Sequence, residues 1–250
     1  MTYQYDVRLS KRLSWLLRHG VESRGLKLRP DGFLELEKVL KLKDFASYTS
    51  EDIEHVVEWN NKKRFGVVRE RGRITLIRAV QGHSVHVDEE QLLTKIDQAD
   101  AVPMCIHGTY YTVLESVIRH GINRMMRTHI HFSPGFPGEG VVISGLRRTA
   151  EVAVLIDIKA AMAAGLEFYR SENNVILTSG LNGIVPPEFI SEVVDVASKK
   201  RLPITWTGDH WELPSDFKVK GRDLSSLLEV LVSSSSVDGL TFAKIEDDCF

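Results

Sequence analysis

The segment SWLLRHG, residues 14–20, places two side chains that can carry positive charge side by side near a predicted helix end. The guanidinium of Arg18 is always charged and matches two phosphate oxygens at once, and the imidazole of His19 can donate a hydrogen bond or move a proton. Cations also stabilise the carboxyl end of any helix, and a glycine such as Gly20 commonly follows the last turn. The pattern therefore fits a phosphate site, and simple helix termination explains it as well.

Two more arginines lie next to segments that could contribute to a phosphate-binding site. Arg64 ends the basic run NNKKR, and Arg127 precedes the alternating segment His-Ile-His at residues 129–131. Guanidinium groups that converge between two lobes would bind a dianion such as a phosphate monoester. Spacing along the chain does not establish such convergence, so this remains a hypothesis at the level of the residues.

His129 and His131 lie on one face of a predicted strand, at a spacing that metal sites use. A third ligand with a matching local pattern is missing, although His83 and His86 stand elsewhere in the chain. We therefore favour a pair of hydrogen-bonding histidines and expect no metal. The glycine-rich stretch at 135–140 matches neither a phosphate loop nor the dinucleotide fingerprint GxGxxG.

Length and composition bound the class of protein. The chain has 250 residues, 43% of them hydrophobic, and a formal net charge of −2, which predicts one large or two modest domains. With this charge, affinity for nucleic acid must come from a local basic patch. Two widely separated cysteines, no signal-peptide run and no stretch of ~20 apolar residues indicate an intracellular protein, cytoplasmic or nuclear, without membrane contact. We expect a monomer.

The first 87 residues read as helices followed by a hairpin. Leucines at helical spacing predict a first helix, and the capping pair Thr49 and Asp52 begins a third. The predicted second helix covers residues 34–42, and the predicted strands cover 65–68 and 74–77. This order is typical of a winged-helix-like, RNA-binding lobe over residues 1–87.

The predicted hairpin tip carries Arg69, Arg71 and Arg73. A basic wing of this kind could contact a phosphate backbone. A solvated turn explains the same residues, and from this feature alone we favour the solvated turn.

The rest of the chain divides into three parts. We interpret the polar residues 88–101 as a linker, residues 102–199 as a mixed lobe of strands and helices, and residues 200–250 as an irregular tail. The whole chain is thus predicted to have an α+β fold.

The residues assembled so far resemble one family in several dispersed motifs. The segments are LSKRLSWLLRHG, DGFLELEKVL, NNKKRFGV, IRAVQGHSV, HGTYYTVLESVIRHGI, MMRTHIHFSPG, ISGLRR and ENNVILTSG. They occur in the order found in tRNA 2′-phosphotransferases, and the resemblance covers roughly residues 7–190. It implies that the second lobe is ADP-ribosyltransferase-like and binds NAD⁺ as a cosubstrate.

The resemblance also implies a reaction. The substrate is RNA with an internal 2′-phosphate, as on spliced tRNA, and the phosphate attacks C1″ of the nicotinamide riboside and expels nicotinamide. The ribose 2″-hydroxyl then attacks phosphorus, which releases 2′-hydroxyl RNA and ADP-ribose 1″,2″-cyclic phosphate. A phosphate monoester is already anionic at neutral pH, so it needs cations to hold it rather than a base to activate it.

The family resemblance assigns residues to three groups. The implied catalytic residues are Arg18, His19, Arg64 and Arg127. The implied NAD-binding residues are His107, Gly108, Thr109, His131, Ser133, Gly145 and Arg148. Contacts to the RNA backbone, or support of the lobe junction, are implied for Arg78, Gln81 and His83, together with Gly82 and Ser84 of the same segment.

Three other functions remain open at this point. A metal-dependent phosphohydrolase would use the histidines near residue 130 and would need no NAD⁺. A winged-helix module would bind nucleic acid without turnover. An ADP-ribosyltransferase that caps nucleic-acid terminal phosphates would stop after the first step. Fold alone does not separate these functions.

Overall fold

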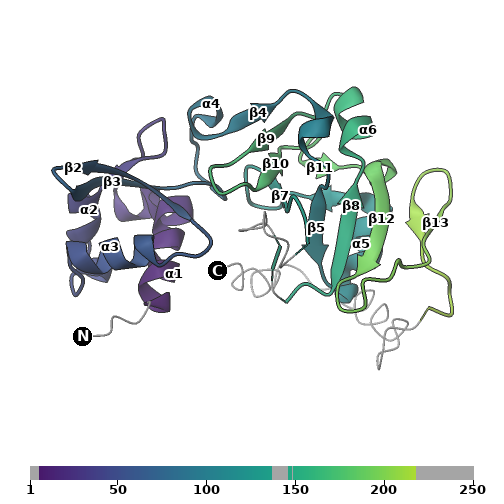
Figure 1. Cartoon of the computed structure of the whole chain (residues 1–250), viewed down its shortest axis with the longest axis horizontal. Coiled ribbons are helices and arrows are strands. Elements are labelled where there is room, and N and C mark those ends of the chain that lie inside the picture. Colours follow the sequence, from purple (N-terminus) through teal and green to yellow (C-terminus); the bar gives the residue numbers. More distant parts are fainter. Residues whose placement is uncertain (1–5, 137–145, 148, 218–250) are drawn as a thin grey trace.

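The computed structural model describes residues 6–136, 146–147 and 149–217, and it has two bodies joined by an extended segment (Figure 1). The first body, drawn in purple and dark blue, packs helices against a small antiparallel sheet. The second, drawn in teal and green, is built around larger antiparallel sheets. Both bodies mix helices and strands, which agrees with the predicted α+β class. Among the described residues, every helix is too short or too polar to span a bilayer.

The first body encloses one apolar core. Leu9, Leu13 and Leu17 of the first helix are fully buried, together with Ile53 and Ile77 from later elements. The elements in chain order are α1 (Val7–Trp15), η1 (Leu16–Gly20), η2 (Glu22–Arg24), β1 (Leu34–Glu35), α2 (Leu36–Leu40), η3 (Lys43–Phe45), α3 (Ser50–Glu58), β2 (Phe65–Glu70) and β3 (Arg73–Ala79).

Two local predictions in this body have different outcomes. The capping box of Thr49 and Asp52 is present at the start of α3, as the sequence predicts. The helix predicted over residues 34–42 is shorter, because Leu34 and Glu35 pair with β3 and form β1 before α2 begins. A long-range strand pairing thus replaces the first turn of the expected helix.

The hairpin β2–β3 is longer than predicted because its turn is very short. Arg71 and Gly72 both have positive φ, 50° and 81°, which is the geometry of a two-residue hairpin turn. The strands therefore reach residues 70 and 73, where Glu70 lies opposite Arg73. The predicted five-residue turn is mostly strand.

The second body holds the remaining elements. They are α4 (Glu89–Leu92), β4 (Thr94–Ile96), η4 (Ala99–Ala101), β5 (Ile106–Thr109), α5 (Tyr111–His120), β6 (Ile122–Asn123), β7 (Ile130–Phe132), β8 (Val152–Ile156), α6 (Ile158–Ala163), β9 (Phe168–Arg170), β10 (Ile176–Thr178), β11 (Ile184–Val185), η5 (Pro187–Phe189), β12 (Ile190–Asp195), β13 (Thr205–Trp206) and β14 (Trp211–Glu212). One sheet has the order β4-β9-β10-β7 and another the order β12-β8-β5. The two sheets meet where Ile106 and Ser133 exchange backbone hydrogen bonds.

Residues 88–101, which we expected to be a linker, are part of the second body. Strand β4 pairs with β9, so that Lys95 lies opposite Tyr169, and Ile96 enters the core. The extended connection between the bodies is therefore shorter than predicted and lies just after β3. Because pairing with β9 depends on residues over seventy positions away, local polarity did not reveal it.

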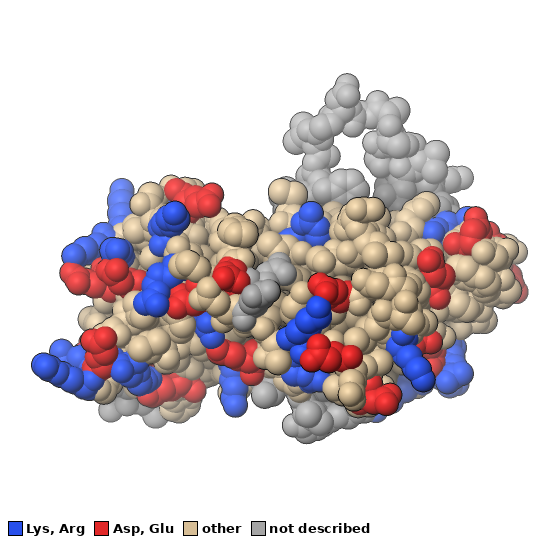
Figure 2. All heavy atoms as spheres, turned by 90° about the horizontal axis from the view of Figure 1, so that it is seen from above, with Lys and Arg blue, Asp and Glu red and all other residues tan. Residues whose placement is uncertain are grey.

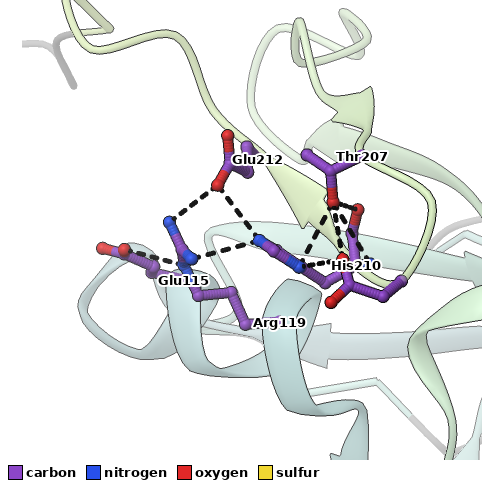
Figure 3. A network of polar contacts seen from close by, with 6 residues as sticks. Glu115, Arg119, Thr207, His210 and Glu212 are labelled. Carbon is purple, nitrogen blue, oxygen red and sulfur yellow. Dashed lines mark hydrogen bonds and ion pairs between the residues drawn. The ribbon is translucent and has the colours of Figure 1, made fainter.

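The region predicted to be an irregular tail begins with an ordered hairpin. Strands β13 and β14 pair with each other, and the indole of Trp211 donates to the carbonyl oxygen of Pro187 at 3.0 Å. Figure 3 shows how Arg119 of α5 contacts His210 and Glu212 of this hairpin. The hairpin is thus fastened to the second body, and residues 218–250 lie outside the described residues.

Candidate functional site

Arg18 and His19 lie in a π-helical turn, η1, that continues α1. Such turns are rare and occur frequently at functional sites. Gly20 does not end the helix as predicted, since the left-handed glycine that follows is Gly25, with φ of 69°. Instead, a Cβ at Gly20 would lie 2.3 Å from the ring of Trp15. The glycine thus lets an aromatic ring pack against the turn that presents Arg18 and His19.

The junction segment, residues 81–84, lies directly against this turn. Gly82 has a φ of 88°, and a Cβ there would lie 3.3 Å from the guanidinium of Arg18. The Ser84 backbone N–H donates to the Arg18 carbonyl oxygen at 3.0 Å, and Ser84 Oγ lies 2.9 Å from His19 Nδ1. The connection between the two bodies therefore fixes both candidate residues.

The same segment is held from the other side by the second body. Thr128 directs its backbone N–H and its hydroxyl at the carbonyl oxygen of His83, at 3.1 and 3.2 Å. Thr128 directly follows Arg127, so this contact brings Arg127 to the turn that holds Arg18 and His19. The backbone next to Arg127 thus lies against the segment that contacts Arg18 and His19, and the charges of Arg18 and Arg127 both act on His19.

The charges of Arg18 and Arg127 also act on histidines at the junction. Burial, then the charges of Arg18 and Arg127, lower the pKa of His19 to about 4. Burial and the Arg18 and His19 charges lower the pKa of His83 to about 3. The pKa of His131 lies well below its usual range because of burial, Arg127 and Arg18. At neutral pH these imidazoles are neutral, and the positive charge of the site comes from the arginines.

Backbone hydrogen bonds hold Arg64 next to the residues that lead into the junction segment. Its N–H donates to Asn60 Oδ1 at 3.2 Å, and its carbonyl oxygen accepts from the N–H of Val80 at 3.0 Å. The amide of Asn173 in the second body donates to the Lys62 carbonyl oxygen at 2.9 Å. The basic run that ends at Arg64 thus lies at the contact between the two bodies.

Four of the predicted NAD-binding residues lie together where β5 meets β7. His107 Nδ1 is 3.1 Å from the carbonyl oxygen of His131, and Ser133 donates through Oγ to the Gly135 carbonyl oxygen at 2.7 Å. Thr109 is buried at the end of β5. Burial, opposed by this backbone hydrogen bond, lowers the pKa of His107 to about 4. Nε2 of His131 is buried and has no hydrogen-bond partner among the described residues.

Of the other three predicted NAD-binding residues, the structure describes only Gly108. Gly108 permits close packing, since a Cβ there would lie 2.6 Å from the Leu146 side chain. Gly145 and Arg148 lie outside the described residues. The structure therefore places His107, Gly108, Thr109, His131 and Ser133 together and says nothing of the remaining two.

Arg78 spans the two bodies. Its guanidinium forms an ion pair with Glu172, donates to the Asp31 carbonyl oxygen at 3.0 Å and lies 4.5 Å from the centre of the Phe33 ring. These contacts favour support of the junction over a contact with RNA. Two further candidates for RNA contacts are buried in the junction segment, namely Gln81 and His83.

Two residues near the site carry contacts that the sequence did not reveal. Thr128 fixes the junction segment, and the charge of Arg147 contributes to the lowered pKa of His107. Each stands next to a residue that was predicted, in the motifs RTHIH and LRR. Their roles depend on contacts across the junction, which adjacent sequence does not show. Among the described side chains, no three metal-ligating residues gather into a metal site.

Comparison with known proteins connects this site to a family. Residues 4–180 match the family described as RNA 2′-phosphotransferase, Tpt1/KptA family. The chain is 45% identical over 191 residues to tRNA 2′-phosphotransferase 1 of Danio rerio, covering 74% of this chain and 84% of that protein. The Homo sapiens protein of the same name is 39% identical over 206 residues, covering 82% and 81%. The tRNA 2′-phosphotransferase of Saccharomyces cerevisiae is 35% identical over 196 residues, covering 76% and 84%.

The matched region contains both sides of the junction, from the π turn to the strands that hold His107 and His131. Two arginines from different bodies converge there on neutral imidazoles, an arrangement suited to binding a phosphate dianion. The chain belongs to the RNA 2′-phosphotransferase family, Tpt1/KptA.

Proposed function

We propose that this chain removes an internal 2′-phosphate from RNA, with spliced tRNA as the substrate, by transferring the phosphate to NAD⁺. The products are 2′-hydroxyl RNA, ADP-ribose 1″,2″-cyclic phosphate and nicotinamide. The observation that carries the proposal is the junction segment, which contacts the turn of Arg18 and His19 on one side and Thr128, the neighbour of Arg127, on the other. The relatives named as tRNA 2′-phosphotransferases support the choice of substrate.

The arginines account for the binding of the 2′-phosphate. A phosphate monoester has a second pKa of about 6, so it carries close to two negative charges at neutral pH and is already a nucleophile. Guanidinium groups hold it through paired hydrogen bonds and later stabilise the charge of the phosphoryl transition state. We assign this role to Arg18, Arg64 and Arg127.

His19 is placed to act through one ring nitrogen. Ser84 engages Nδ1, so Nε2 is the nitrogen available to the phosphate or to the departing 2′-oxygen. The pKa of His19 is lowered by burial and by Arg18 and Arg127, so the ring is neutral before substrate binds. A bound dianion would favour the protonated ring, which can then protonate the leaving 2′-oxygen.

The residues around β5 and β7 fit a nicotinamide nucleotide. NAD⁺ supplies an electrophilic sugar carbon with nicotinamide as its leaving group. The buried, unpartnered Nε2 of His131 offers a polar contact, and Gly108 lets β5 pack closely against the Leu146 and Ala150 side chains. The neutral rings of His107 and His131 add no positive charge beside a cationic nicotinamide. We assign the same strands, with Thr109 and Ser133, to the cosubstrate.

This assignment gives each body a task. The first body acts as a winged-helix-like lobe that binds RNA, and the second as an ADP-ribosyltransferase-like lobe that binds NAD⁺. The 2′-phosphate then lies at the junction, where contacts from both bodies meet. The shared junction segment keeps the two substrates in one orientation, which is a large part of catalysis for a reaction between two bound molecules.

A mixing assay tests the proposal. The protein is incubated with a short RNA bearing one internal 2′-phosphate, with and without NAD⁺, and with EDTA in a parallel sample. We expect release of nicotinamide and formation of 2′-hydroxyl RNA, dependent on NAD⁺ and insensitive to EDTA. A stable ADP-ribosyl adduct on a terminal phosphate would instead identify a capping transferase. Conversion that needs a metal but not NAD⁺ would identify a phosphohydrolase, and binding without conversion a binding module.

A further inference from the structure

A groove runs along the outer face of α1, away from the core of the first body. It is shallow and widely open to solvent, has a volume of about 420 Å³ and is lined by Arg8, Lys11, Arg12, Trp15, Arg24 and Asp44. Four of these six side chains are cationic, one is aromatic and one is a carboxylate. The groove thus combines an excess of positive charge with an apolar surface, as single-stranded nucleic acid sites do.

The spacing of residues along α1 indicates that this groove extends towards the candidate active site. Arg8, Lys11 and Trp15 are spaced so that they share the face of α1 opposite the buried leucines. His19 follows Trp15 by four residues, about 6 Å along a helix axis at ~1.5 Å per residue. The Trp15 ring packs against Gly20, next to His19. The groove therefore ends at the turn that presents Arg18 and His19.

Two cations of the groove are held in fixed positions. Arg12 donates to the carbonyl oxygen of Asp44 at 2.5 Å and lies 5.9 Å from the centre of the Tyr48 ring. Arg24 pairs with the Asp44 carboxylate at 2.5 Å and lies 5.6 Å from the centre of the Trp15 ring. The lining of the groove thus contains four cationic side chains and one carboxylate, and Arg12 and Arg24 are held in a preformed arrangement.

The arginines at the hairpin tip are more closely matched by carboxylates than the cations of the groove. Arg69 pairs with Glu54 and also with Glu58 at 3.7 Å, and Arg73 lies opposite Glu70 in the strand register. On the face drawn in Figure 2, cationic and anionic side chains are likewise interspersed over both bodies. These pairings weaken the case for the hairpin as the RNA contact and favour the groove on α1.

We propose that the α1 groove binds the phosphodiester backbone of the RNA next to the nucleotide whose 2′-phosphate enters the junction. The inference rests on the proposed function, since it concerns the part of the RNA substrate next to the reacting nucleotide. Arg8, Lys11, Arg12 and Arg24 contact backbone phosphates, and Trp15 provides the apolar surface for an adjacent nucleotide. The groove thereby gives affinity for RNA longer than the reacting dinucleotide.

The test compares two double variants of the first body. Arg8→Ala with Lys11→Ala removes two cations from the groove, and Arg71→Ala with Arg73→Ala removes two exposed arginines from the hairpin tip. Binding of a 2′-phosphorylated anticodon stem-loop and a 2′-phosphorylated dinucleotide is measured by fluorescence anisotropy over a salt series, without NAD⁺. For the stem-loop, we expect the groove variant to bind about tenfold more weakly than the unaltered protein at low salt. The slope of log affinity against log salt concentration should become shallower by about 1.4, or ~0.7 for each lost phosphate contact.

The expected loss is larger for the stem-loop than for the dinucleotide, and larger than the loss in the hairpin variant. Equal affinities of the groove variant and the unaltered protein, or a greater loss in the hairpin variant, would overturn the inference. Thermal melting and turnover of the dinucleotide report whether each variant is folded. If the unaltered protein converts neither RNA in the presence of NAD⁺, the proposed function fails, and this outcome is distinct from failure of the groove.

Discussion

At the scale of single residues, the site depends on small neighbours as much as on its arginines. Gly20 leaves room for the Trp15 ring, and Gly82 leaves room for the Arg18 guanidinium. Ser84 contacts the backbone of Arg18 and the ring of His19. The orientation of Arg18 and His19 is therefore set by small residues to which we assign no catalytic role.

The substitution Gly20→Ala tests the packing of the π turn. A Cβ there would lie 2.3 Å from the Trp15 ring, so the turn or the indole must move. Overpacking of this kind costs about 1–3 kcal/mol. We expect urea denaturation to show a loss of that size, together with a loss of turnover as Arg18 and His19 shift. Gly25→Asn, at an open left-handed position that asparagine tolerates, is the control and should change both much less.

The substitution Ser84→Ala tests the positioning of His19. Without the hydroxyl 2.9 Å from Nδ1, the ring is free to rotate and to change tautomer, so we expect kcat to fall by roughly tenfold. Ser84→Thr keeps the hydroxyl and should restore most of the rate. The pH profile of kcat should also change in Ser84→Ala and not in Ser84→Thr. An unchanged profile in both variants would show that Ser84 does not orient the imidazole.

At the scale of elements, the junction is held by contacts that cross between the bodies. Arg78 of β3 reaches Glu172 in the second body, and Asn173 reaches the Lys62 carbonyl oxygen in the first. Thr128 holds the junction segment from the second body. These contacts fix how the two bodies, which carry the candidate residues Arg18 and Arg127, lie against each other.

The substitution Arg78→Ala should loosen that junction. It removes an ion pair, a hydrogen bond to the Asp31 carbonyl oxygen and the contact with the Phe33 ring. Together these contacts stabilise the folded protein by about 1–3 kcal/mol, which urea denaturation would measure. Arg78→Lys keeps the charge but not the planar fork, so we expect partial recovery. Full stability in Arg78→Ala would mean that the junction does not depend on this side chain.

Local sequence patterns predicted the elements that local interactions define. The capping box of α3 and the hairpin β2–β3 both appear near their predicted positions. The strands β1 and β4 did not, because each forms only by pairing with a distant strand. The π turn was missed for another reason, since Arg18, His19 and Gly20 also fit an ordinary helix end, and the local packing of the Trp15 ring against Gly20 is not visible in the sequence. Arg18, His19 and Arg127 could be predicted as candidates, but only the junction shows how they converge.

At the scale of the whole molecule, positive charge is local rather than general. The chain has a formal net charge of −2, yet two arginines act on the same imidazoles at the junction. Several histidines there are neutral because burial and nearby arginines oppose their protonation. The folded state therefore binds fewer protons than the unfolded chain in mildly acidic solution.

This difference predicts loss of stability below neutral pH. In the unfolded chain, His83 takes up a proton near pH 6.5, whereas burial, Arg18 and His19 lower its pKa in the folded protein to about 3. The free energy of unfolding therefore falls as the pH drops from 6.5 towards 4. At pH 5 this residue alone lowers it by about 2 kcal/mol. Urea denaturation from pH 7.5 to pH 5 should show this slope, and His83→Gln should reduce it.

The most direct test of the account follows the phosphorus atom. An RNA labelled with ³²P in its internal 2′-phosphate is incubated with the protein and NAD⁺, and the products are separated by chromatography. We expect the label to leave the RNA and to appear in ADP-ribose 1″,2″-cyclic phosphate, and the variants Arg18→Ala and Arg127→Ala to abolish this transfer. Label recovered as inorganic phosphate, or label that stays on RNA still bound by the protein, would contradict the account.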